Sequence, residues 1–206
     1  RQDITTRWVP PNKRDKAYLF VQNQVNKGRQ AFVICPLIEE SDSLQAKAAT
    51  KEYHTLSEKV FPELQLGLLH GKMPTSEKDQ VMNKFRSHQV DILVSTPVVE
   101  VGIDVPNATV MLVEAADRFG LSQLHQFRGR VGRGEHKSYC LLLAEDPSEV
   151  AQERLLAMEH THDGFKLAEM DLSLRGPGEY FGTKQSGFPG LKMARLSDTD
   201  LLTMAQ

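Results

Sequence analysis

Residues 126–134 combine arginines and glycines just before an apolar run at 138–143. If the start of this tract is helical, Gln126, Arg130 and Arg133 fall at positions i, i+4 and i+7, and their side chains leave the same face. Guanidinium groups are planar donors that are always charged, which suits phosphate and above all the spread charge of a phosphoryl-transfer transition state. The alternative is a solvated arginine-rich turn that makes surface ion pairs.

Two of the glycines in this tract, Gly129 and Gly132, stand between its arginines. Inside a helix, glycine costs roughly 1 kcal/mol relative to alanine. Their presence therefore predicts either a helix end or a close approach of two backbones at these positions.

A second tract, residues 95–106, follows an apolar run and contains Thr96, Gly102 and Asp104. A hydroxyl at the carboxyl end of a central strand can bind a phosphate oxygen, and an aspartate there can accept a hydrogen bond from a ribose hydroxyl. A simpler interpretation is also open, in which Asp104 belongs to a turn before the next strand and Thr96 stands at a helix start.

A third tract, residues 69–74, ends another apolar run and contains His70 and Gly71. Its backbone N–H groups can meet phosphates if a helix begins directly after it. The alternative is a tight turn that is capped by the hydroxyl of Thr75 or Ser76.

A scaffold must bring these tracts together. Short apolar runs alternate with longer amphipathic stretches, which predicts a parallel, doubly wound sheet with right-handed crossovers. In such a sheet, ligands bind beyond the carboxyl ends of the strands. The expected strands are residues 31–35, 66–69, 90–94, 110–113 and 139–143, and the expected helices are 15–26, 44–60, 76–86 and 121–130.

Asp146 and Pro147 mark a break in this pattern. After them the sequence predicts helical segments at 148–160 and 165–170 and a glycine-rich tract at 174–190, without a strand. We therefore expect an α/β domain over residues 1–146 and an extension over residues 147–206.

Composition limits the possible functions. The 206 residues are enough for one α/β domain with an appendage. Because 25 Lys and Arg balance 27 Asp and Glu, any contact with nucleic acid must be local. Cys35 and Cys140 lie in apolar runs, which predicts reduced, buried thiols. No apolar run is long enough to span a membrane, and the first residues lack an initiator Met and a signal-peptide core, so we expect a piece of a longer protein.

In this order, the three tracts resemble motifs of the second motor domain of superfamily 2 helicases and translocases. Residues 70–73 resemble the family's motif at the end of a β-strand, which precedes the contact with the tracking DNA strand. Residues 95–106 resemble motif V. Residues 126–133 match the Q-x-x-G-R-x-G-R pattern of motif VI at every fixed position. The resemblance implies a RecA-like fold, a doubly wound parallel sheet in a three-layer α/β/α arrangement.

Residues 117–126, 171–179 and 182–187 narrow the resemblance to the RecG family of bacterial branched-DNA helicases. The transcription-repair coupling translocases share the motif that follows motif VI, but they usually have a variant of the Arg-Gly-Pro-Gly-Glu sequence found here at residues 175–179. The resemblance covers residues 7–206. It implies that a helical hairpin and a glycine-rich loop, together a translocation motif, follow the motor domain.

Family roles can be transferred to matching positions of this sequence. In related motors, the two motif VI arginines reach across an interdomain cleft to ATP, which is bound with Mg²⁺ mainly by the first motor domain. Here these arginines would be Arg130 and Arg133. The resemblance also places Gln126 near the γ-phosphate, and Gly102 with Asp104 along the nucleotide.

The DNA-related positions follow in the same way. The resemblance implies that Thr96, together with the tract of His70 and Gly71, contacts the DNA backbone. In the translocation motif, the polar positions that link hairpin to loop are Arg154, Arg175 and Gln185. Without the resemblance, Arg154 would be an exposed helix arginine, and the other two would be solvated loop residues.

Two elements of a complete ATPase are missing from this sequence. The nearest approach to a Walker A loop, residues 67–73, has too few residues between its glycines and ends in methionine. No acidic D-E-x-H type sequence is present to hold Mg²⁺. We therefore expect no ATP hydrolysis by this chain alone. His160 and His162 have no third ligand nearby, so no metal site is expected.

The resemblance implies half of an ATP-driven motor that remodels replication forks and Holliday junctions in DNA repair and recombination. Its partners would be branched DNA and an upstream motor domain of the same protein, without a membrane, in the cytoplasm of a bacterium near the nucleoid. The alternatives are a duplex-DNA translocase of the transcription-repair coupling type and a non-catalytic nucleic-acid-binding module. A phosphate-binding metabolic enzyme is disfavoured, since the sequence shows neither its own glycine-rich strand-to-helix loop nor a catalytic acid or nucleophile.

Overall fold

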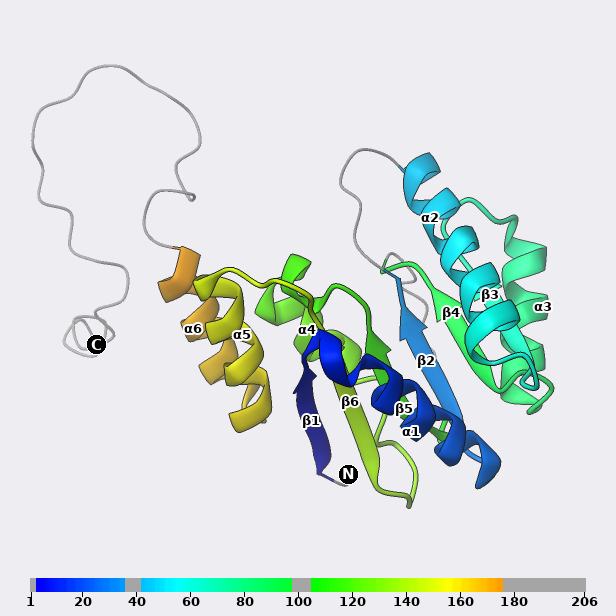
Figure 1. Cartoon of the computed structure of the whole chain (residues 1–206), viewed down its shortest axis with the longest axis horizontal. Helices are drawn as coiled ribbons and strands as arrows, with labels where there is room; N and C mark the ends of the chain where they lie inside the picture. The colour runs from blue at the N-terminus through cyan, green and yellow to red at the C-terminus, as the bar shows by residue number, and fades with distance from the viewer. Residues whose placement is uncertain (1–2, 36–41, 98–104, 176–206) are drawn as a thin grey trace, which may run out of the picture.

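The computed structural model describes residues 3–35, 42–97 and 105–175 (Figure 1). Within them, six strands form one sheet in the order β1-β6-β5-β2-β4-β3, and every neighbouring pair is parallel. The strands are β1 (Ile4–Val9), β2 (Gln30–Ile34), β3 (Leu66–Leu69), β4 (Ile92–Ser95), β5 (Ala108–Val113) and β6 (Ser138–Leu143). All five expected strands are present, and the doubly wound parallel sheet is confirmed.

Helices connect most of the strands. They are α1 (Arg14–Asn26), α2 (Asp42–Thr55) with a final π-helical turn (Leu56–Val60), α3 (Thr75–Arg86), α4 (Leu121–Arg128), α5 (Glu149–His160) and α6 (Gly164–Arg175). Single 3-10 turns lie at Pro11–Lys13 and Ala116–Arg118. Every expected helix is found, but α4 ends at Arg128 rather than at residue 130. The last helix is longer than the predicted 165–170.

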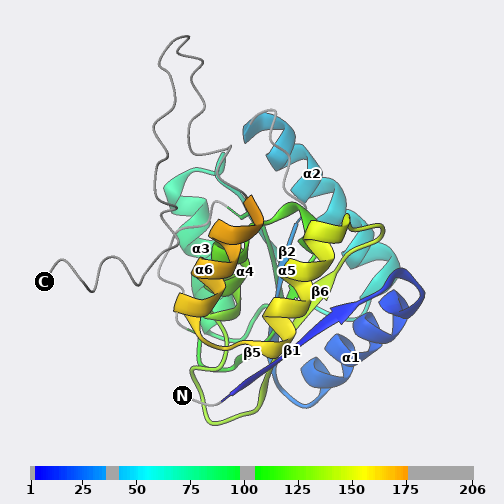
Figure 2. The ribbon, with the colours of Figure 1, turned by 90° about the vertical axis from the view of Figure 1, so that its left-hand side faces the viewer.

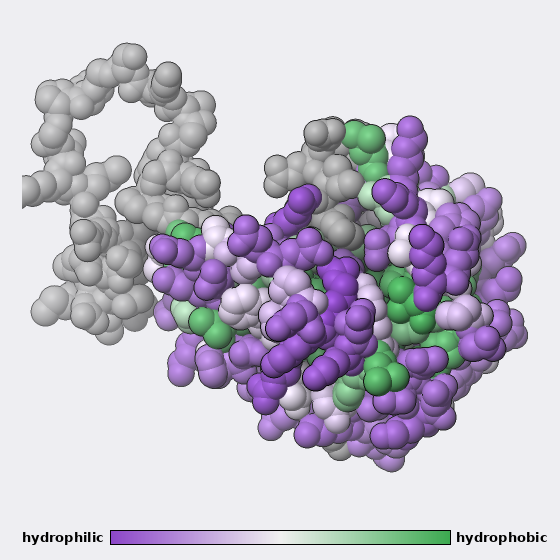
Figure 3. All heavy atoms as spheres, in the orientation of Figure 1, coloured by the Kyte–Doolittle hydropathy of each residue, from purple (hydrophilic) through white to green (hydrophobic). Residues whose placement is uncertain are grey.

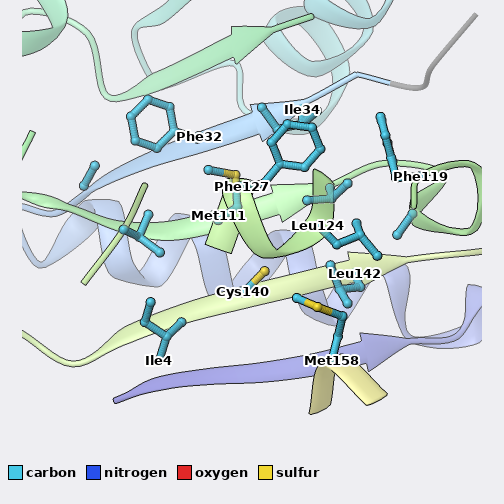
Figure 4. Close-up of a cluster of buried hydrophobic side chains, with 14 of the residues drawn as sticks. Ile4, Phe32, Ile34, Met111, Phe119, Leu124, Phe127, Cys140, Leu142 and Met158 are labelled. Atoms are coloured by element: carbon cyan, nitrogen blue, oxygen red, sulfur yellow. The ribbon is translucent and has the colours of Figure 1, made fainter. Parts of the chain in front are cut away.

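The helices cover both faces of the sheet, which confirms the three-layer α/β/α arrangement (Figure 1, Figure 2). One face packs against α1 and α2 with its final turn, through residues such as Val21 and Leu56. The other face packs against α3, α4, α5 and α6, and Phe32 of β2 belongs to that core. In Figure 4, Phe127 of α4 and Met158 of α5 lie among the side chains of this second core. Because strand side chains alternate between faces, the strands buried on both sides are apolar almost throughout.

The sequence pattern does not predict β1, which pairs with β6 along one edge of the sheet. Its polar residues hide it, since Thr5 and Arg7 lie on the same face as the buried Val9 and interrupt the apolar pattern. A strand edge has unpaired backbone groups. Here the N–H of Trp8 donates to the Glu159 carboxylate of α5 at 2.6 Å, so α5 covers part of the edge.

The two helices after residue 146 form the hairpin that the family resemblance implies. Leu155, Met158 and Leu167 of this hairpin belong to the same core as α4, so α5 and α6 pack on the sheet. The division into units at residue 146 stays a prediction.

The cysteines and the surface of the molecule have the environments that the sequence predicts. Cys35 and Cys140 are free and buried, as predicted. Hydrophilic side chains cover most of the face in Figure 3, where hydrophobic residues form only small patches. Among the described residues, no helix combines the length and the apolar character needed to cross a membrane.

Candidate functional site

Two of the three chemical tracts meet at the carboxyl edge of the sheet. β3 and β4 pair in parallel with Leu69 opposite Ser95, so His70 and Thr96 follow at neighbouring strand ends. The backbone N–H of Thr96 donates to the Leu69 carbonyl at 3.1 Å, which extends the pairing by one step. This edge is where a parallel sheet predicts a ligand.

Polar atoms at these two strand ends lack partners. The Thr96 side chain is only 1% exposed, and neither its hydroxyl nor Nδ1 of His70 has a hydrogen-bond partner within the described part of the chain. Burial, followed by the charge of Lys78, lowers the pKa of His70, so its imidazole is neutral near pH 7. A buried polar group without a partner costs about 1–3 kcal/mol. These atoms are therefore suited to an incoming ligand.

The loop that follows β3 is fixed and open to solvent. Nζ of Lys78 donates to the Gly71 carbonyl at 2.8 Å, and the Met73 N–H donates to the His70 carbonyl at 3.2 Å. Pro74 is the N-cap of α3, without a side-chain hydrogen bond, so the expected alternative of a hydroxyl cap is wrong. A Cβ at Gly71 would meet no atom within 4 Å, so packing within the chain does not require glycine there.

The arginine tract folds differently from the expected continuous helix. α4 ends at Arg128, Gly129 is its C-cap, and Gly132 has a φ of 76°, a left-handed conformation that favours glycine. The expectation of a helix end at the glycines is confirmed. The i, i+4, i+7 argument is wrong, because Arg130 and Arg133 lie on the turn beyond the helix. We call residues 129–133 the arginine turn.

The arginine turn is accessible and lies against the end of the second tract. Arg133 and Gln126 are exposed and Arg130 is half-buried. Directly after the turn, a Cβ at Gly134 would collide with the Pro106 carbonyl oxygen, so the two backbones approach closely there. Gly102 and Asp104 lie outside the described residues.

Arg128 is a site residue that the sequence analysis missed. Its side chain is 3% exposed, and Nη1 donates to the carbonyls of Met158 and Thr161 at 3.0 and 2.8 Å. Nη2 lies 2.9 Å from Nδ1 of His125. A signal was present, since Arg128 follows the buried Leu121 and Leu124 at helical spacing and therefore belongs to the inner face of α4.

The hairpin also contacts the beginning of α4. The Leu121 N–H donates to Oδ1 of the buried Asp171 at 3.3 Å. Arg154 is part-buried and donates to the Phe119 carbonyl at 3.4 Å, so the alternative of an exposed helix arginine is wrong. The side chain of Arg175 and all of Gln185 lie outside the described residues.

A second missed cluster precedes α4 at the end of β5. The Tyr18 hydroxyl donates to Glu114 at 2.7 Å, and Arg14 forms an ion pair with the same carboxylate at 3.1 Å. Burial raises the pKa of Glu114, while these two partners favour its charged form. The next residue, Ala115, has a φ of 46°, which is unusual for a residue with a Cβ. This cluster fixes the beginning of the connection between β5 and α4.

The described residues contain no group of three His, Cys, Asp or Glu placed to hold a metal ion. The site instead has guanidinium groups at the arginine turn, and at the strand ends it has a hydroxyl and an imidazole close to the ammonium group of Lys78. Such a donor set fits phosphate groups.

Residues 13–135 match the model of the helicase conserved C-terminal domain. The chain belongs to this helicase family. Residues 161–206 match a second model, described as ATP-dependent DNA helicase RecG, domain 3, C-terminal.

Relatives extend the match along the whole chain. It is 54% identical to the ATP-dependent DNA helicase RecG of Bacillus subtilis over 194 residues, which are 94% of this chain and 28% of that protein. It is 52% identical to RecG of Synechocystis over an alignment 207 residues long, which covers 100% of this chain and 25% of that protein. A solved structure of RecG bound to a three-way DNA junction has a TM-score of 0.73 and 49% identity, and the match covers 87% of this chain and 23% of that one. The resemblance to the RecG family is confirmed, and the chain spans about a quarter of the length of these relatives.

Proposed function

We propose that this chain is the second motor domain and translocation motif of an ATP-dependent helicase that remodels branched DNA, such as forks and Holliday junctions. The observation that carries the proposal is an accessible arginine turn next to a strand-end tract, in a chain about half identical to RecG proteins throughout. Residues 1–146 would form the motor unit and residues 147–206 the translocation unit. As the relatives are bacterial, the protein would act in the cytoplasm at the nucleoid.

The proposed nucleotide role rests on the arginine turn. Arg130 and Arg133 would stabilise the negative charge that develops on the γ-phosphate, and Gln126 would donate a hydrogen bond close by. Gly102 and Asp104 would line the nucleotide. ATP would supply the transferred phosphoryl group, and Mg²⁺ would be held mainly by acidic residues of the upstream motor domain, as the family resemblance implies.

The proposed DNA role rests on the strand ends. The Thr96 hydroxyl can donate to a phosphate oxygen, and neutral His70 can donate from one ring nitrogen. The uncapped first turn of α3 presents backbone N–H groups and the positive end of the helix dipole beside Gly71. Arg154, Arg175 and Gln185 would then transmit motion between the hairpin and the loop that grips duplex DNA.

The test uses the full-length protein with forked DNA. Wild type should hydrolyse ATP when DNA is added and should separate the fork without RNA polymerase, unlike a transcription-repair coupling translocase. Arg133→Ala should lower kcat on the order of 10³-fold, as loss of an arginine finger does, with little change in DNA affinity. If the variant hydrolyses ATP normally but loses DNA binding, the arginine turn contacts DNA phosphates and the nucleotide assignment is wrong.

A further inference from the structure

The hairpin holds α4 at both ends. At the first turn of α4, Asp171 of α6 accepts the N–H of Leu121. At the last turn, Arg128 donates to two carbonyls at the carboxyl end of α5. A helix of 8 residues has little stability of its own, so neighbouring elements set its direction.

Arg128 suits this position for an electrostatic reason. The last carbonyls of a helix lack intrahelical partners and carry the negative end of the helix dipole. Met158 is in the last turn of α5, and Thr161 is its C-cap. A buried guanidinium therefore satisfies otherwise unpaired acceptors with charge-assisted hydrogen bonds. The His125 ring is fixed on the same side, since a Cβ at Gly164 would come within 2.9 Å of its Nε2.

The arginine turn begins at the residue after Arg128. We propose that Arg128 is a positioning residue for ATP hydrolysis, which acts through Arg130 and Arg133 by holding the base of their turn against the end of α5. Arg128 itself is buried among protein acceptors and does not reach the nucleotide. The inference rests on the proposed nucleotide role of the arginine turn.

A positioning role makes a kinetic prediction. Displacing a catalytic group by about 1 Å lowers the rate on the order of 10²-fold. Arg128→Met in the full-length protein keeps the length of the side chain but removes its donors, so it should lower kcat for DNA-stimulated ATP hydrolysis by about that factor. The KM for ATP should change little, because the upstream motor domain provides most of the ground-state binding. Arg128→Lys keeps the charge and part of the hydrogen bonding, and should retain an intermediate kcat.

Ser148→Ala is the matched control. The Ser148 hydroxyl accepts from the Ala151 N–H at 3.3 Å and caps the opposite end of α5, away from α4. Its loss should lower the melting temperature of the hairpin region while kcat stays near wild type. The melting temperature of each variant is measured first. If Arg128→Met is unfolded at the assay temperature, the kcat of Arg128→Lys tests the positioning role in its place.

The outcomes separate the inference from the function on which it rests. A normal kcat for Arg128→Met, or an equal loss of kcat in Ser148→Ala, overturns the positioning role even if Arg133→Ala is inactive. A normal kcat for both Arg130→Ala and Arg133→Ala overturns the positioning role and the nucleotide role together, since no catalytic arginine would then need to be positioned. The inference is supported if kcat is lowest in Arg128→Met, intermediate in Arg128→Lys and highest in wild type, while Ser148→Ala keeps a kcat near wild type.

Discussion

Two polar clusters are buried near α4 and at the strand ends, and they differ in how their hydrogen bonds are satisfied. Around Arg128, donors and acceptors find one another: a guanidinium, two carbonyls and a histidine nitrogen. Beside β3 and β4, the Thr96 hydroxyl and Nδ1 of His70 have no partner in the described residues. A satisfied cluster stabilises the fold, whereas an unsatisfied one lowers stability and is available to a ligand. Substitutions in the two clusters should therefore have opposite effects on folding.

The largest effect is expected in the satisfied cluster. Arg128→Met leaves the carbonyls of Met158 and Thr161 without their donor, and each such group costs about 1–3 kcal/mol. The free energy of unfolding should fall by about 3 kcal/mol, measured by urea denaturation of this chain. If it is unchanged, water reaches these carbonyls and the cluster does not stabilise the fold.

Two glycines allow the same comparison for the backbone. Gly134→Ala places a Cβ against the Pro106 carbonyl oxygen, whereas Gly71→Ala places it in open space. Overpacking costs about 1–3 kcal/mol, so Gly134→Ala should destabilise the chain by that amount. Gly71→Ala should leave stability unchanged or raise it by about 0.5 kcal/mol.

DNA binding is the second property to measure for the Gly71→Ala variant. If the DNA backbone approaches Gly71 closely, Gly71→Ala should weaken DNA binding by the full-length protein severalfold, although the fold is intact. Equal DNA affinity of Gly71→Ala and wild type, in a titration at fixed salt, would contradict an approach at this loop.

The sequence predicted the sheet better than it predicted the site. The buried strands are recognisable because their apolar runs do not alternate, while β1 has polar residues such as Thr5 and Arg7 at the sheet edge. Motif spacing identified three tracts, and the structure places two of them at neighbouring strand ends. The helical spacing of Gln126, Arg130 and Arg133 was misleading, because the helix ends at Arg128, and the glycines at 129 and 132 were the signal for this end.

Burial explains the roles that were missed. Arg128 and Glu114 are charged residues at positions that the fold encloses, and their partners, such as Thr161 and Tyr18, are distant in sequence. Periodicity shows which face of a helix is buried, but not that an arginine on this face will find acceptors on another helix. Such pairs follow only from the three-dimensional structure.

A smaller effect of the opposite sign is expected at the unsatisfied cluster. Thr96→Val removes a hydroxyl that has no partner and keeps the shape of the side chain. The chain should become more stable by about 1 kcal/mol in urea denaturation. DNA affinity of the full-length protein should fall by about tenfold at most if the hydroxyl donates to a phosphate. A destabilised Thr96→Val variant would mean that the hydroxyl already has a partner, and the comparison between the clusters would no longer hold.

The smallest expected effect is the pH dependence of His70. Burial lowers its pKa in the folded chain, so the unfolded chain binds more protons just below the ordinary value of about 6.5. Stability of the DNA-free chain should therefore fall as pH drops from 7.5 towards 5.5, and the His70→Gln variant should lack this part of the loss. A DNA phosphate beside the ring would have the opposite effect, since a negative charge favours the imidazolium and raises the pKa. The increase in melting temperature on adding DNA should consequently grow as pH falls in wild type but not in His70→Gln. Parallel pH profiles for the two proteins would place the DNA phosphate away from His70 and leave Thr96 as the contact at this edge.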